Sequence, residues 1–204
     1  MGISELFRGR ENYHAEGVDW TCRGAAQEYE LMPIPADAEL VARAQAVAEC
    51  LGARGLTLAT VESCTGGYVA KLLTDVPGSS RWFEAGYVTY SNAAKQRDVG
   101  VLAQTLLLHG AVSEAVVREM AEGALSRTGA DLAVSLSGVA GPDGGTPRNP
   151  VGTVWIGLSR REGGSLRTDA SHHRFDGDRD AVRRQAVLAA LAAVLEPFTA
   201  SVDD

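Results

Sequence analysis

Three potential nucleophiles lie side by side in the segment TVESCTGGYVAKL. Ser63, Cys64 and Thr65 follow an apolar run and precede Gly66 and Gly67, a pattern typical of a strand, a tight turn and the start of a helix. Glycines let backbone N–H groups approach a ligand, and the positive end of a helix favours a phosphate, a carboxylate or a tetrahedral oxyanion. An equally good interpretation is a strand–helix turn whose hydroxyls only cap the helix. The segment is not a P-loop, because no lysine follows the glycines.

A second polar segment, VTYSNAAK, holds a candidate base. Tyr90 and Asn92 lie at the end of a predicted strand, where Asn92 is a candidate helix cap, and Lys95 follows one helical turn later. A lysine can act as the general base of a serine when burial lowers its pKa. A lone lysine is more often solvated at the surface. Cys64 is the rival nucleophile, but no histidine in the sequence is an obvious base for it.

The third segment that could contribute to a functional site is the glycine-rich stretch SLSGVAGPDGGTPRNP. Ser137 and Gly138 end a predicted strand, and Gly141 follows three residues later. The stretch is either a flexible surface loop or a backbone clamp around a polar ligand. A glycine loop alone is a weak signal for either function.

The elements that must position these residues alternate between helix and strand, which predicts a layered α/β domain. Two strands around Gly163 and Gly164 form a predicted antiparallel hairpin near the C-terminal end of the sheet, so the sheet should be mixed. The expected helices are 38–51, one beginning within 66–74, 93–99, 113–127 and 180–195, and the expected strands are 56–61, 83–91, 131–138, 151–159 and 166–175.

The first 33 residues differ in pattern from the rest of the chain. Residues 1–33 are polar, lack helical or strand periodicity and are followed by the punctuation PIPAD. They are expected to be an N-terminal extension, either a tail or an arm that docks through its aromatic side chains. Residues 34–204 are expected to form one domain, a size that 171 residues allow.

The composition of the chain limits the kinds of molecule that the protein is expected to bind. The formal charge of −7 argues against general binding to nucleic acid, which needs a basic face. The spacing of histidine and cysteine predicts no metal site. No signal peptide is visible, and the longest apolar run, 186–195, is too short to span a bilayer, so a cytoplasmic protein without membrane contact is expected. A homodimer is expected because domains of this size commonly pair through two-fold interfaces.

These segments together resemble the CinA C-terminal domain family, and in particular its stand-alone members, the nicotinamide mononucleotide deamidases. The likeness covers roughly residues 37–197 and rests on the stretches ESCTGG, PGSSRWFEAGYVTYSNAAK, HGAVSE, SGVAGPDGG, PVGTVW and GDRDAVRRQA. It implies a three-layer α/β/α sandwich and hydrolysis of the amide of a small-molecule nucleotide, nicotinamide mononucleotide, without any cofactor. The stretch TPRN at 146–149 departs from the family's acidic versions.

The resemblance also implies roles for single residues. Ser63 matches the family's nucleophile, Lys95 its base and Tyr90 a tyrosine beside them. The other residues that match segments around the substrate are Glu62, Thr65, Gly66, Gly67, Asn92, Ser113, Ser137, Gly138, Gly141, Arg179 and Arg183. An alternative from another class is a non-catalytic nucleotide-binding or interaction module, because such domains also occur fused to others.

Overall fold

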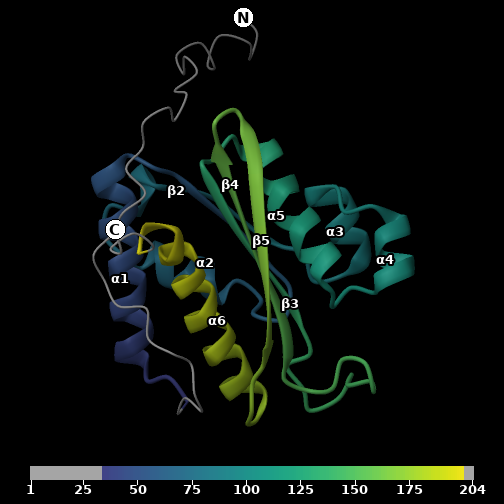
Figure 1. Cartoon of the computed structure of the whole chain (residues 1–204). Coiled ribbons are helices and arrows are strands. Elements are labelled where there is room, and N and C mark those ends of the chain that lie inside the picture. Colours follow the sequence, from purple (N-terminus) through teal and green to yellow (C-terminus); the bar gives the residue numbers. More distant parts are fainter. Residues whose placement is uncertain (1–33, 200–204) are drawn as a thin grey trace, which may run out of the picture.

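The computed structural model describes residues 34–199 of the chain. The predicted N-terminal extension, 1–33, lies outside the described residues. Helices pack against both faces of a central sheet, as Figure 1 shows. The expected three-layer α/β/α sandwich is therefore confirmed.

The sheet has five strands in the order β2-β1-β3-β4-β5. β1 pairs in parallel with β2 on one side and β3 on the other, whereas β4 and β5 continue the sheet in antiparallel pairing. The mixed sheet and its C-terminal hairpin thus agree with the sequence-based prediction. The strands are β1 (Leu58–Glu62), β2 (Phe83–Val88), β3 (Leu132–Gly138), β4 (Thr153–Glu162) and β5 (Ser165–Arg174).

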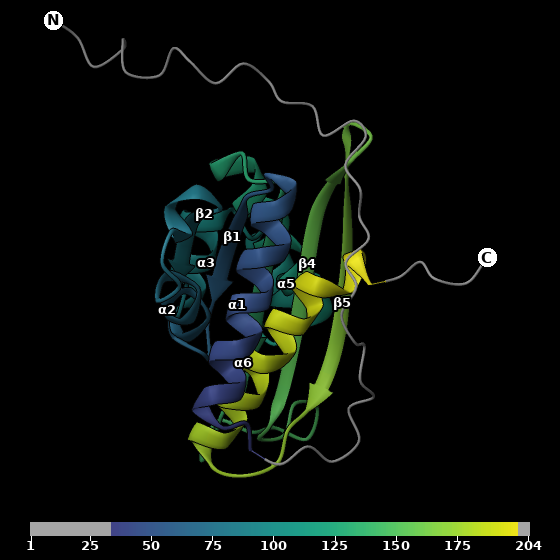
Figure 2. The same cartoon turned by 90° about the vertical axis from the view of Figure 1, so that its left-hand side faces the viewer.

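Six α-helices of the described chain cover the two faces of the sheet. α1, α2 and α6 pack on one face, where α1 and α6 lie side by side in Figure 2, and α3, α4 and α5 pack on the other. The helices are α1 (Asp37–Arg54), α2 (Tyr68–Thr74), α3 (Asn92–Val99), α4 (Ala103–His109), α5 (Glu114–Thr128) and α6 (Arg179–Leu195), with single 3-10 turns at Ser79–Arg81 and Glu196–Phe198.

The central strands are buried on both faces, which explains their continuous apolar sequence. Every residue of β1 is buried, and so are six of the seven residues of β3. One apolar cluster fills the space between the sheet and α1, α2 and α6, and a smaller one lies under α5 and α3. β1 pairs with β2 and β3 up to its last residue, so the loops that leave the carboxyl ends of the three strands start next to one another.

The structure corrects several local expectations. α4 was not predicted, because the run LLL in its sequence shows no amphipathic period. The strand expected at 83–91 ends at Val88, and the cap of α3 is Ser91 rather than Asn92, with Ser91 Oγ accepting a hydrogen bond from the Ala94 amide. Ser113 caps α5 as its sequence predicted.

Candidate active site

Two adjacent parallel strands bring the first two polar segments together. β1 and β2 are paired through Glu62 and Val88, so Ser63 and Thr89 leave the sheet at the same edge. Thr89 N donates to Glu62 O at 2.8 Å, which keeps the two chains paired one step beyond β2. Lys95 then lies in the first turn of α3, over the end of β1.

Lys95 and Ser63 are in direct contact. Lys95 Nζ lies 2.9 Å from Ser63 Oγ and donates a second hydrogen bond to Thr89 O at 2.7 Å. Only 1% of the surface of Lys95 is exposed, and burial lowers the pKa of its amine to about 8. The neutral form that a general base requires therefore becomes the major form above about pH 8, well below the pH at which an ordinary lysine loses its proton.

Cys64, the rival nucleophile, lies in a different electrostatic environment. It is 7% exposed and belongs to the apolar cluster beneath α2 and α6. Burial, and secondarily the charge of Glu62, raises the pKa of its thiol to about 11. Because the thiolate is the nucleophilic form, Cys64 is poorly suited to react at neutral pH.

A cavity of about 240 Å³ opens beside the Ser63–Lys95 pair. The lining includes parts of all three predicted segments, and it also includes Arg179 at the start of α6. The lining residues are Ser63, Cys64, Tyr90, Asn92, Lys95, Ala111, Val112, Ser137, Gly138, Ala140 and Arg179.

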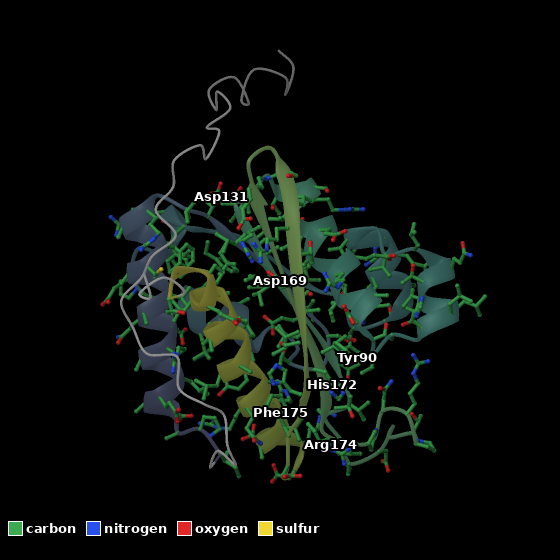
Figure 3. All side chains as sticks on the ribbon, viewed as in Figure 1. Tyr90, Asp131, Asp169, His172, Arg174 and Phe175 are labelled. Carbon is green, nitrogen blue, oxygen red and sulfur yellow. The ribbon has the colours of Figure 1, made fainter. Side chains whose placement is uncertain are left out.

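Tyr90 and Arg179 meet at the exposed side of this cavity. Arg179 Nη2 donates to Tyr90 Oη at 3.2 Å, and Arg179 Nη1 donates to Gly141 O at 2.7 Å. Tyr90 is 64% exposed and follows the carboxyl end of β2, and Figure 3 shows it near His172, well below Asp131. The guanidinium therefore links the β2–α3 connection to the glycine-rich loop.

Ser137 and Gly138 form the β3 side of the cavity. Ser137 Oγ donates to Ala111 O at 2.7 Å, which holds the segment before α5 against the sheet. A Cβ on Gly138 would lie 2.6 Å from Thr153 O, so this position tolerates no side chain. Gly138 is thus required by the close approach of β4.

Several predicted site residues do not line the cavity. Ser113 caps α5 and lines a neighbouring cavity, while Gly141 contributes only its carbonyl to Arg179. Arg183 Nη2 donates to Thr65 O at 2.8 Å, behind the turn. Glu62 is fully buried and bonds to backbone amides of the turn and α2.

Most backbone amides of the turn at Gly66 and Gly67 already donate hydrogen bonds within the protein. Gly66 and Gly67 have positive φ values of 62° and 93°, which fold the chain back sharply before α2. The Gly66 amide donates to Ser63 O at 3.2 Å, and the Gly67 amide donates to Glu62 Oε2 at 3.0 Å. Of the amides of Thr65, Gly66 and Gly67, only that of Thr65 has no hydrogen bond within the described chain.

Sequence reasoning missed the segment Ala111–Val112 and the carbonyl of Thr89. The segment lies in HGAVSE, which already carried part of the family resemblance, but apolar residues gave no chemical signal. Val112 also borders the second cavity, of about 480 Å³, where Arg118, Arg148, Trp155 and His172 gather over α5 and the β4–β5 hairpin. Thr89 O acts through its backbone, which no side-chain pattern reveals.

Within residues 34–199, no cluster of three or more histidine, cysteine or acidic side chains is arranged to hold a metal ion. No helix in that same range combines the length and apolar character needed to cross a membrane.

Fold and site together define an α/β protein with a buried serine–lysine pair at the carboxyl edge of its parallel strands. The family model described as the CinA C-terminal domain matches residues 41–198. The chain belongs to this family.

Individual relatives cover most of the chain. Nicotinamide-nucleotide amidohydrolase PncC of Escherichia coli strain K12 is 55% identical over 79% of this chain and 96% of its own length. The enzyme with the same name from Pseudomonas putida is 56% identical over 67% of this chain and 83% of its own length.

Solved structures agree with the fold. The competence damage-inducible protein A from Klebsiella pneumoniae superposes with a TM-score of 0.73 at 43% identity, covering 77% of this chain and 95% of that one. A competence/damage inducible protein from Agrobacterium tumefaciens gives a TM-score of 0.73 at 35% identity, over 82% of this chain and 99% of its own.

Proposed function

We propose that this protein hydrolyses the amide of nicotinamide mononucleotide to nicotinic acid mononucleotide and ammonia through a Ser63–Lys95 acyl-enzyme. The observation that carries the proposal is the 2.9 Å contact between Lys95 Nζ, with its lowered pKa, and Ser63 Oγ at a cavity. The names of relatives that are more than half identical support the substrate and the class, an amidohydrolase.

The reaction begins when neutral Lys95 takes the proton of Ser63. Ser63 Oγ attacks the amide carbon, and the carbonyl oxygen becomes an oxyanion. We assign the oxyanion to the start of the turn, where neither the Cys64 amide nor the Thr65 amide has a hydrogen bond within the described chain and where Cys64 lines the cavity.

The intermediate then collapses with loss of ammonia. The C–N bond breaks as Lys95 returns the proton to the leaving nitrogen, with the Tyr90 hydroxyl as the second candidate donor at the cavity. An ester of Ser63 remains. Lys95 next removes a proton from water, whose oxygen attacks this ester, and the proton passes to Ser63 Oγ as the acid product leaves.

The substrate phosphate needs a cationic partner. Arg179 lines the cavity and lies at its exposed side, and Arg183 lies behind the turn with its Nε buried and unpartnered in the described chain. Asn92, Ser137 and Gly138 complete the polar and backbone lining around the substrate.

The proposal also covers the cellular location and the oligomeric state of the protein. The chain would act in the cytoplasm, in the recycling of pyridine nucleotides, as a homodimer. Three leucines on or beside α4, Leu102, Leu107 and Leu108, are 60–84% exposed, an apolar surface that pairing of two copies would cover. Light scattering at micromolar concentration tests the dimer.

An ammonia assay with nicotinamide mononucleotide tests the activity. We expect stoichiometric ammonia and nicotinic acid mononucleotide from the wild-type protein, and neither from Ser63→Ala. Tight binding of the nucleotide without ammonia release would instead favour the non-catalytic nucleotide-binding module.

A further inference from the structure

Glu62, the last residue of β1, places a fully buried carboxylate next to the proposed nucleophile. Its Oε2 accepts hydrogen bonds from the amides of Gly67 at 3.0 Å and Val69 at 3.1 Å, and Oε1 accepts from Ala70 at 2.8 Å. All three donors belong to the N-terminal end of α2, where backbone amides otherwise lack partners.

This arrangement differs from the other helix starts that lead into the site. Ser91, Ser113 and Asp178 each cap the helix that follows immediately, through a side-chain oxygen. The residue before α2 is Gly67, which has no side chain to do so. The cap instead comes from five residues upstream, across the turn that carries Ser63.

The consequence is a closed loop of bonds around Ser63. The chain leaves the sheet at Glu62, passes through the turn, and returns to the Glu62 carboxylate through the first amides of α2. Further hydrogen bonds join Ser63 N to Leu136 O at 3.1 Å and Gly66 N to Ser63 O at 3.2 Å. The carboxylate therefore ties together the two ends of the turn that carries Ser63.

The Glu62 carboxylate satisfies these amides out of contact with solvent. Glu62 does not line the cavity beside Ser63. A phosphate or carboxylate of the substrate would have to displace a buried charge to reach these amides, which is unfavourable.

We propose that Glu62 is a positioning residue: its carboxylate ties the first amides of α2 to the end of β1 and thereby fixes Ser63 Oγ against Lys95 Nζ, without contacting substrate. The kinetic part of this inference rests on the proposed amidase function. The geometric part concerns the reactivity of Ser63 toward any electrophile.

Glu62→Gln is the variant that tests it. Glutamine keeps the size of the side chain but turns one acceptor into a donor that faces backbone donors, so at least one of the three hydrogen bonds is lost. We expect kcat to fall about 100-fold, the scale of a misplacement of about 1 Å in a reacting group. We expect KM and the dissociation constant of nicotinic acid mononucleotide to change less than about threefold, because Glu62 does not touch ligand.

Asp131→Asn is the matched control. Asp131 Oδ2 accepts hydrogen bonds from Thr57 N at 2.8 Å and Thr57 Oγ1 at 2.9 Å, so it too is a carboxylate bound to the chain before a strand. Asp131 precedes β3 whereas Tyr90 follows β2, so the two lie beyond opposite ends of the parallel strands, and Figure 3 shows them well apart. We expect this variant to lose thermal stability and to keep its kcat.

Two results would overturn the inference. A fall in kcat that tracks the loss of thermal stability equally in both variants would make Glu62 a fold stabiliser only. An increase in the product dissociation constant of Glu62→Gln with kcat unchanged would make Glu62 a substrate ligand.

A substrate-independent measurement separates this inference from the proposed function. Phenylmethylsulfonyl fluoride should sulfonylate Ser63 of the wild type, detected as a mass increase on the peptide that contains it, and about 100 times more slowly in Glu62→Gln. If the wild type is labelled but releases no ammonia, the amidase proposal fails and the labelling rates still decide the role of Glu62. If wild-type Ser63 is not labelled, or both proteins react at one rate, the inference is wrong.

A second variant serves if Glu62→Gln does not fold. Glu62→Asp keeps the charge but is one methylene shorter, so the carboxylate cannot reach all three amides at their present distances. Folded Glu62→Asp should be labelled at least about tenfold more slowly than wild type. Labelling at the wild-type rate would contradict the inference.

Discussion

The two ends of the β1–β3 pair both hold polar groups, yet only one end is suited to chemistry. At the amino end, the Asp131 carboxylate accepts from Thr57 N and Oγ1, and Asp131 N and Leu132 N both donate to Thr57 O. At the carboxyl end, Glu62 is satisfied in the same way, but Ser63 and Lys95 beside it face a cavity.

The difference lies in what burial does to the groups. At the amino end the Asp131 carboxylate is matched by the donors of Thr57. At the carboxyl end, burial lowers the pKa of Lys95 to about 8 and raises that of Cys64 to about 11. Perturbed titratable groups at a cavity mark a functional site better than buried polarity alone does.

The substitution Lys95→Met should have the largest effect on activity, because it removes the base that distinguishes the carboxyl end from the amino end. Methionine fills a similar volume without a base, so the rate of acylation should fall by about two to four orders of magnitude. The measurement is single-turnover release of ammonia from nicotinamide mononucleotide.

Lys71→Met is its control, because Lys71 is the other of the chain's two lysines and pairs at the surface with Asp75. We expect its rate within about twofold of wild type, since exposed ion pairs contribute little. An equal loss in both variants would show that Lys95 has no special role.

The next expected effect is the dependence of the rate on pH. A general base must be neutral, and the pKa of Lys95 is lowered to about 8, so the neutral form grows as pH rises through 8. We expect kcat/KM to rise about tenfold per pH unit below 8 and to level off above it. A plateau that begins below pH 6 would contradict the protonation of Lys95 described here.

The sequence predicted part of the fold and of the candidate site, but not all of either. The hydrophobic periods and the turn residues predicted the layered mixed sheet, and the family motifs predicted the pair Ser63 and Lys95. The sequence did not show that Ser63 and Lys95 are in contact. They are 32 residues apart in the chain, and the parallel pairing of β1 and β2 brings them within hydrogen-bond distance.

Glu62 shows where sequence reasoning stops. The family resemblance placed it among the residues around the substrate, but Glu62 does not line the cavity. Its carboxylate turns to α2, where Gly67 leaves the helix without a capping side chain. The alternative that the hydroxyls of the turn cap this helix is wrong, and the acceptor that satisfies the first amides of α2 is set by the tertiary fold.

A smaller effect is expected from Cys64→Ala, which sharpens the contrast between the two neighbouring nucleophiles. A thiol with a pKa of about 11 is protonated at pH 7.5, so its removal should change kcat less than about threefold. Steady-state kinetics at pH 7.5 measure this. Loss of activity comparable to that of Ser63→Ala would transfer the role of nucleophile to Cys64.

The smallest expected effect on activity comes from Asp131→Asn, and it probes the amino end directly. Asparagine keeps one acceptor for Thr57 but loses the charge that strengthens both hydrogen bonds, so the free energy of unfolding should fall by about 1 kcal/mol. For a domain of this size that lowers the thermal midpoint by roughly 2–4 °C. The rigid sheet between the two ends should keep kcat within about twofold of wild type. A tenfold loss of kcat at temperatures where the variant is folded would mean that the two ends are coupled, and that positioning at the carboxyl end depends on the whole length of β1 and β3.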